Sequence, residues 1–184
     1  MTYSGFADSD PIRQFASVGE YAFRNPEARD AAAVSALIAA CPPLDPNSLY
    51  CNLLQCTHFA ATCIMAEREG SLDGWISGHR PPNDPEAMFV WQVAVDERAR
   101  GRGLGAAMLD ALWRFPGVAD ARRLITTVTP SNHISRAMFT AFARRHGAAL
   151  TVQPWFHREH HFGGSHESEE LISIGPLPRR PTRL

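Results

Sequence analysis

Hydrophobic residues recur along the chain with the periods of both strands and helices. Apolar runs and alternation predict strands over residues 21–24, 62–67, 72–77, 88–95, 123–128, 149–152 and 171–174. Helical spacing predicts a helix capped by Asp30 and stopped by Pro42-Pro43, and further helices over 45–59, 104–112 and 137–142, the last ended by Gly147. We expect Phe89, Trp91, Val93 and Val95 to alternate onto one face. A hairpin followed by strands that alternate with helices indicates an α/β fold with a mixed sheet.

The chain has 184 residues, a length that fits one domain with its own core. Residues 1–20 mix Ser, Gly, Asp and Pro without periodicity, so we expect a poorly ordered leader. A single domain is expected over 21–177, followed by a short tail, 178–184. The segment 155–168 is predicted to be a histidine-rich loop.

Charge and cysteine usage narrow the class of protein. The formal net charge is −1, which argues against general attraction to nucleic acid or a membrane surface. Neither a long apolar run nor a secretory signal is present, so we expect a cytoplasmic protein that does not span a membrane. The four cysteines form no CxxC pair, so they are expected to be reduced, buried, small apolar residues rather than zinc ligands.

The stretch with the clearest chemistry is the glycine-rich segment that joins a strand to a helix at 93–105. Its layout directs several unpaired backbone N–H groups at one point, and Arg98, Arg100 and Arg102 add positive charge there. Glycines let the backbone approach phosphate oxygens closely. The Gly-Lys-Ser/Thr of a P-loop is missing, and the spacing GxGxG differs from the GxGxxG of dinucleotide-binding folds. We therefore expect a pyrophosphate site of another kind.

Arg100-x-x-Gly103-x-Gly105 resembles the acetyl-CoA loop of the GCN5-related N-acetyltransferase (GNAT) superfamily, and the resemblance covers about residues 21–176. It implies a mixed, mostly antiparallel, twisted sheet flanked by helices, with acetyl-CoA as co-substrate. The cofactor-binding residues that it implies are Val93, Ala94 and Val95 for the pantetheine arm, Arg100, Gly101, Arg102, Gly103, Leu104 and Gly105 for the pyrophosphate, and Asn132 with Ser135 beside the CoA arm.

One position departs from the superfamily pattern. Many members carry a Tyr seven residues after the Asn, as general acid for the departing thiolate, and this chain has Phe139 there. Because Phe has no proton to donate, either another group protonates the thiolate or the thiolate leaves unprotonated.

Longer motifs narrow the resemblance to the L-2,4-diaminobutyrate acetyltransferases of ectoine synthesis. They are the segments 44–54, 56–59, 89–96, 125–132 and 174–177. The resemblance implies direct transfer of acetyl to the 4-amino group of L-2,4-diaminobutyrate, without a covalent enzyme intermediate, by a homodimer that serves osmoprotection. Another small amine, such as a polyamine or an antibiotic, remains an alternative acceptor, and a non-catalytic acetyl-CoA sensor is a third interpretation.

An acceptor with two ammonium groups needs carboxylates or aromatic faces. Asp45 is the candidate for binding an amine, and Tyr50 and Trp91 are the candidate walls of the pocket. Glu159 is the first candidate for the general base and His160 the second. The backbone N–H of Val93 is the candidate for stabilising the oxyanion.

Each candidate also has a purely structural interpretation. Asp45 could be an N-cap, Trp91 a core residue, Tyr50 a packing residue, Glu159 a surface charge and Asn132 a helix start. The histidines at 157, 160, 161 and 166 match no standard zinc spacing, so we expect a polar lid loop and no metal.

Overall fold

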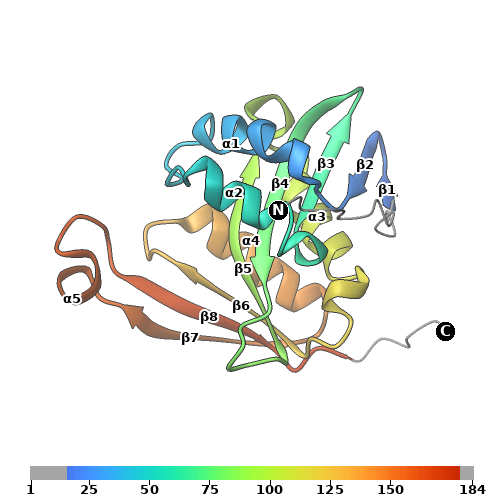
Figure 1. Cartoon of the computed structure of the whole chain (residues 1–184). Coiled ribbons are helices and arrows are strands. Elements are labelled where there is room, and N and C mark those ends of the chain that lie inside the picture. Colours follow the sequence, from blue (N-terminus) through green and yellow to red (C-terminus); the bar gives the residue numbers. More distant parts are fainter. Residues whose placement is uncertain (1–15, 179–184) are drawn as a thin grey trace, which may run out of the picture.

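The computed structural model describes residues 16–178, which form a single twisted sheet with helices on both faces (Figure 1). Its eight strands lie in the order β1-β2-β3-β4-β5-β6-β8-β7. Their bounds are β1 Ala16–Val18, β2 Tyr21–Arg24, β3 Ile64–Arg68, β4 Ser71–His79, β5 Ala87–Val95, β6 Arg123–Val128, β7 Ala149–Phe156 and β8 Glu169–Gly175. Strands β5 and β6 run parallel, whereas the other neighbouring pairs run antiparallel. The predicted mixed, mostly antiparallel sheet is confirmed.

The helices divide between the two faces of the sheet. They are α1 Ala31–Ala39, α2 Leu49–Gln55, α3 Leu104–Leu112, α4 His133–Arg145 and α5 Arg158–Phe162, with 3-10 turns at Ala28–Asp30, Ala60–Thr62, Glu97–Ala99 and Pro116–Val118. Apolar residues of α3 and α4 form the larger core with β5, β6 and β8. Residues of α1 form a second core with β3 and β4, on the other face. The predicted helix over 45–59 is shorter, because Ser48 caps α2 and its Oγ accepts the N–H of Cys51 at 3.1 Å.

Three of the four cysteines are buried as the sequence predicts, whereas Cys51 is only partly buried. All four are free, and Cys41, Cys56 and Cys63 are buried in the core beneath α1. Burial raises the pKa of Cys56 and of Cys63 to about 12. A thiol with so high a pKa holds almost no thiolate near neutral pH, so neither group is a nucleophile.

A β-bulge in β5 changes which side chains face which core. Gly78 of β4 pairs with Val90 and Ser77 pairs with Gln92, which leaves Trp91 as the extra residue. Before the bulge Val90 lies in the α3–α4 core, and after it Ala94 lies in the α1 core. The prediction of one uninterrupted face for Phe89, Trp91, Val93 and Val95 is therefore wrong, because the extra residue reverses the alternation.

The C-terminal part of the sheet extends away from the body as an arm, which we define as β7, α5 and β8, residues 149–175 (Figure 1). The predicted loop at 155–168 instead contains the end of β7 and the short helix α5. At the other end of the sheet, β1 lies within the segment predicted to be a leader, whereas the remainder of that leader, 1–15, and residues 179–184 lie outside the described residues.

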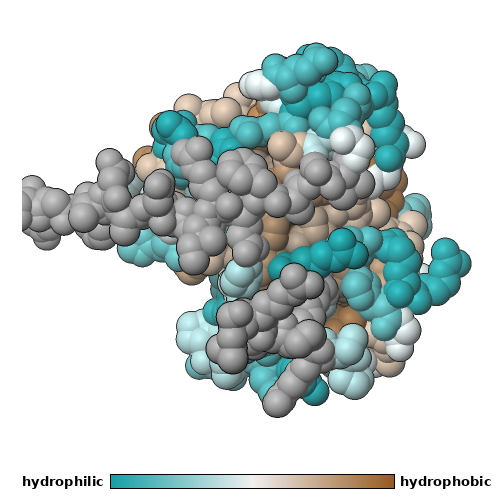
Figure 2. All heavy atoms as spheres, turned by 90° about the vertical axis from the view of Figure 1, so that its right-hand side faces the viewer, coloured by the Kyte–Doolittle hydropathy of each residue, from teal (hydrophilic) through white to brown (hydrophobic). Residues whose placement is uncertain are grey.

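Figure 2 views the molecule from the side that lies at the right of Figure 1. Hydrophilic residues occupy much of this face and surround a smaller area of apolar residues. No helix in the described part of the chain is long and apolar enough to cross a membrane.

An ion-pair network joins strands β2 and β3 to the start of α1. Arg24 donates to Asp30 at 2.6 and 2.9 Å and to Glu67 at 2.6 and 2.9 Å. Asp30 stands at the N-cap of α1, as predicted, but its side chain binds Arg24 and the Glu27 N–H instead of the helix amides. Burial favours a higher pKa for Asp30, but these hydrogen bonds outweigh burial and the pKa is lowered.

We expect Arg24→Met to destabilise the protein by about 2 kcal/mol, because two largely buried carboxylates lose their partner. A lowered carboxyl pKa contributes stability above the ordinary value near 3.8 and loses it as the pH falls below that value. Urea unfolding at pH 7 and pH 3.5 measures both effects. A wild-type advantage as large at pH 3.5 as at pH 7 would contradict this account.

Candidate active site

The site begins where β5 and β6 separate. The two strands pair only over the first residues of each, Ala87 to Phe89 against Arg123 to Ile125. Along its other edge β6 pairs with β8 from Leu124 to Val128, so beyond Ile125 only the pairing with β5 stops. The separating edge of β5 includes Val93, Ala94 and Val95, the residues predicted to bind the pantetheine arm. An exposed backbone edge of this kind binds an extended amide-containing chain by adding it as a further strand.

The glycine-rich loop lies directly at the end of this edge. Gly101 and Gly103 have φ of 74° and 76°, a left-handed conformation that strains any other residue. Gly103 is the N-cap of α3 and supplies no side-chain cap, so Leu104 and the residues after it present their N–H groups. Glycine is favoured at position 105 for a different reason, because a Cβ there would lie 3.2 Å from Met138 Sδ. The loop therefore combines an open helix N-terminus with the close packing of α3.

The three arginines of the loop have different partners. Arg98 donates to Asp96 at 2.8 Å, and this hydrogen bond is the main cause of the lowered pKa of Asp96. The Nε of Arg100 donates to the Val95 carbonyl at 3.0 Å, so the side chain closes the end of β5. Arg102 donates to Glu20 at 3.3 Å from an exposed position. Arg98 thus stabilises the turn, whereas Arg100 and Arg102 lie at the loop predicted to bind phosphate.

On the opposite side of the split, Asn132 is the N-cap of α4. Its Oδ1 accepts the backbone N–H of Ser135 at 3.0 Å, which leaves the amide Nδ2 as the group that could donate to a ligand. Phe139 is 2% exposed and lies in the core formed with α3. The helix start predicted as an alternative role of Asn132 is present and does not exclude binding through Nδ2.

The predicted acceptor residues lie on the α1–α2 face, beside β5. The side chain of Asp45 is 80% exposed and lies 3.7 Å from His166 Nε2. Because Ser48 is the cap of α2, the N-cap interpretation of Asp45 is wrong. Tyr50 and Trp91 are 69% and 45% exposed, so neither is a core residue in this chain. The ring centroids of Trp91 and His79 lie 6.5 Å apart, so the two rings belong to the same part of the surface.

The sequence analysis did not predict two polar residues of this site, Gln92 and His79. Gln92 is buried and donates from Nε2 to the Asp45 carbonyl at 2.8 Å, and its Oε1 accepts from Asn47 at 2.7 Å. His79 lies between the rings of Phe89 and Phe59, and burial lowers its pKa, so its ring is neutral near pH 7. A polar residue in the middle of the apolar strand 88–95 was the available signal for Gln92. Nothing in the local sequence pointed to His79.

The two candidate general bases lie neither on β5 nor on the loop that carries Asp45. Glu159 and His160 belong to α5 at the end of the arm, which Figure 1 shows projecting away from β5. The Glu159 side chain is 75% exposed and lies 3.4 Å from Arg158. The arm nevertheless reaches the acceptor face within one chain, because His166, a few residues after α5, lies 3.7 Å from the Asp45 carboxylate. No group of three or more metal-ligating side chains within the described residues is arranged to hold a metal ion.

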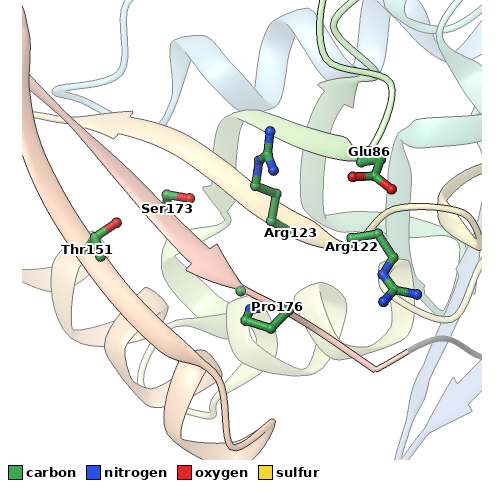
Figure 3. Close-up of a pocket in the computed structure, with 7 residues that line it drawn as sticks. Glu86, Arg122, Arg123, Thr151, Ser173 and Pro176 are labelled. Atoms are coloured by element: carbon green, nitrogen blue, oxygen red, sulfur yellow. The ribbon is translucent and has the colours of Figure 1, made fainter.

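A cavity of about 400 Å³ lies at the other end of β5 and β6, where the strands still pair (Figure 3). It is lined by Glu86, Arg122, Arg123, Thr151, Ser173, Gly175 and Pro176. Figure 3 shows the guanidinium groups of Arg122 and Arg123 pointing in different directions, and Arg123 is paired with Asp84 at 2.6 Å. The cavity contains none of the predicted site residues, so it is separate from the split.

Comparison with known proteins places this geometry in a family. The model of the acetyltransferase (GNAT) family matches residues 31–147. A protein of Methylotuvimicrobium alcaliphilum named L-2,4-diaminobutyric acid acetyltransferase is 45% identical over 152 residues, which cover 83% of this chain and 88% of that protein. A protein of Bordetella parapertussis with the same name is 44% identical over 171 residues, which cover 92% of each.

A solved structure agrees with both findings. Diaminobutyrate acetyltransferase EctA from Paenibacillus lautus, in complex with L-2,4-diaminobutyric acid and coenzyme A, superposes with a TM-score of 0.83 at 40% identity and covers 89% of this chain and 99% of that one. Ard1 from Thermoplasma volcanium, at 18% identity and a TM-score of 0.69, shares the fold. The chain belongs to the acetyltransferase (GNAT) family, in the group of its L-2,4-diaminobutyric acid acetyltransferases.

Proposed function

We propose that this chain transfers the acetyl group of acetyl-CoA to the 4-amino group of L-2,4-diaminobutyrate and so forms N4-acetyl-L-2,4-diaminobutyrate. The observation that carries the proposal is the likeness, at 40% identity, to a structure that binds both L-2,4-diaminobutyric acid and coenzyme A. The split between β5 and β6, with the glycine loop at its end, supports the same reading. The product would serve ectoine synthesis and osmoprotection in the cytoplasm, where acetyl-CoA is available.

The residues of the split have defined tasks in this reaction. The N–H groups after Gly103 hold the pyrophosphate, and the edge of β5 pairs with the pantetheine arm. The neutral 4-amino nitrogen forms a bond to the thioester carbon, and the Val93 N–H stabilises the resulting oxyanion. The nitrogen, now positively charged, loses a proton to water, the C–S bond breaks and the sulfur leaves as a thiolate, since Phe139 donates no proton. The proton lost by the ammonium group passes to a base.

We propose Asp45, with His166, as the group that accepts this proton. Gln92 binds the Asp45 backbone directly beside Trp91, and His166 Nε2 lies 3.7 Å from the Asp45 carboxylate. A carboxylate next to an imidazole can take the proton of an ammonium group directly or through water. The alternative base is Glu159 or His160 on α5, which precedes His166 on the same arm.

We propose that the protein works as a homodimer and that the arm takes part in the contact. β7 is the edge strand of the sheet, and Val152, Trp155 and Phe156 on it are 40%, 46% and 37% exposed. An edge strand with exposed apolar residues favours pairing with another chain. Sedimentation equilibrium should give a dimer for the wild type and a monomer for Trp155→Glu. A wild-type monomer at the concentration used for assays would overturn this proposal.

The function is tested by identifying the product. The protein is incubated with acetyl-CoA and L-2,4-diaminobutyrate, and parallel reactions contain putrescine, spermidine or an aminoglycoside. The proposal predicts one acetyl group on the diaminobutyrate by mass, with the NMR shift change at carbon 4. Acetylation at the 2-amino group, or turnover confined to the other amines, would contradict it. Binding of acetyl-CoA without turnover of any amine would favour the sensor interpretation.

A further inference from the structure

Gln92 owes its orientation to the bulge at Trp91. Because Trp91 is the extra residue opposite Ser77 and Gly78, the alternation reverses and the next side chain turns to the α1–α2 face. There Gln92 is 7% exposed, in the middle of a strand whose other inward residues are apolar. A buried amide at such a position is costly unless its polar atoms are bonded. The structure shows bonds at each of them.

Both polar atoms of the Gln92 side chain hold the same short loop. Nε2 donates to the Asp45 carbonyl at 2.8 Å, and Oε1 accepts from Asn47 Nδ2 at 2.7 Å. The Gln92 backbone N–H donates to Ser77 Oγ at 3.2 Å, so the backbone that carries this side chain is bonded to β4 as well. The loop that carries Asp45 is therefore tied to β5 on either side of Pro46.

The attachment continues into α2. Asn47 Nδ2 also lies 3.3 Å from Asn52 Oδ1, and Asn52 is fully buried on α2. A chain of amides thus runs from strand β5 through the loop to the helix that follows it. Such a chain fixes the distance between the strand and the loop more firmly than one bond would.

The position of Gln92 in the sequence gives this attachment a consequence for catalysis. In the proposed reaction Trp91 walls the acceptor pocket and the Val93 N–H stabilises the oxyanion, and Gln92 lies between these two residues on β5. We propose that Gln92 is a positioning residue that sets the Asp45 carboxylate relative to the thioester. This inference rests on the proposed function. It goes beyond that function, because Gln92 is given a role in aligning the two substrates although its side chain touches neither of them.

The expected result of Gln92→Leu follows from this role. The substitution removes both side-chain bonds to the loop and keeps an apolar group of similar length against α2. An acceptor group misplaced by about 1 Å costs on the order of 100-fold in rate. We therefore expect kcat/KM for L-2,4-diaminobutyrate to fall about 30-fold to 100-fold, while the KM for acetyl-CoA stays within about twofold.

Gln92→Glu gives a pH signature that a merely structural role would not produce. The neutral Glu can still donate to the Asp45 carbonyl, whereas the ionised Glu places a negative charge against it. The activity of Gln92→Glu relative to the wild type, measured at each pH, should therefore rise as the pH falls. A ratio that is constant from about pH 8 to about pH 4, a range that includes the ordinary pKa of a Glu carboxyl, would contradict the proposed bond.

Gln55→Leu is the matched control. Gln55 is also a buried glutamine, 1% exposed, but it lies on α2 and its Nε2 contacts Cys51 Sγ at 3.8 Å. We expect this variant to keep both kinetic constants within about twofold. Equal losses in Gln92→Leu and Gln55→Leu, or a rise in the KM for acetyl-CoA that matches the loss toward diaminobutyrate, would overturn the proposal.

Hydrogen exchange separates this inference from the proposed function. If the wild type does not acetylate diaminobutyrate, the proposed function fails. The attachment itself is still tested at two bonded amides that flank the loop, Leu44, which donates to the Cys41 carbonyl at 3.0 Å, and Asn52, which donates to the Ser48 carbonyl at 3.1 Å. Gln92→Leu should speed exchange at both about tenfold or more, and Gln55→Leu should not. Unchanged exchange at these two amides would show that Gln92 does not hold the loop.

Discussion

Gly103→Val is expected to lower kcat/KM for acetyl-CoA about 100-fold, which corresponds to about 2.7 kcal/mol. Gly103 has a φ of 76° at the N-cap of α3, and a β-branched residue in that conformation costs about 1–2 kcal/mol. The added side chain also keeps phosphate oxygens from the backbone N–H groups. Steady-state kinetics with varied acetyl-CoA and saturating diaminobutyrate measures the loss.

The control for backbone strain is Gly70→Val. Gly70 has a φ of 79° in the turn between β3 and β4, and a Cβ would meet no atom within 4 Å at either glycine. The two variants should therefore lose similar stability in urea, but only Gly103→Val should lose activity. An equal loss of activity in both would mean that strain, rather than phosphate binding, explains the effect.

Asp45→Asn is expected to lower kcat about 100-fold, at the lower end of what a general base contributes. The substitution keeps the shape of the side chain and the backbone bond from Gln92, but it removes the charge beside His166. Because the variant has no carboxylate to take the proton of the ammonium group, its turnover depends on amine that is already neutral, so its residual activity should rise with pH. Turnover of diaminobutyrate from pH 6 to pH 10 measures both effects.

Glu159→Gln is the matched comparison, since it removes an exposed carboxylate at the end of the arm. We expect its kcat within about twofold of the wild type, as for other surface substitutions. If Glu159→Gln loses about 100-fold and Asp45→Asn does not, the base comes from the arm.

The part of the site that faces the cofactor could be predicted from local sequence. The loop after Val95 could be predicted because its glycines and arginines lie within a few residues of one another and their spacing is itself the signal. The start of the helix at Leu104 and the strand over 123–128 could be predicted for the same reason. Each depends on periodicity and capping within one segment.

The acceptor side depends on contacts between distant segments. The bulge at Trp91 exists only because β5 pairs with β4 in a shifted register, so an alternating pattern alone could not show it. Gln92 and Asp45 are 47 residues apart in sequence, and their bond follows from the packing of α2 against the sheet. The strands of the arm were predicted in part, at 149–152 and 171–174, but α5 was not, because it is only five residues long and its histidines resemble a loop.

Hydrogen exchange in the presence of coenzyme A tests most directly whether the split between β5 and β6 holds the co-substrate. We predict slower exchange at amides of Val93 to Val95 that face the split and at those of 101–105, at least tenfold at saturating ligand. Exchange near Arg122 and Ser173, at the separate cavity, should not change. Protection at the cavity without protection of the loop and of β5 would contradict the account.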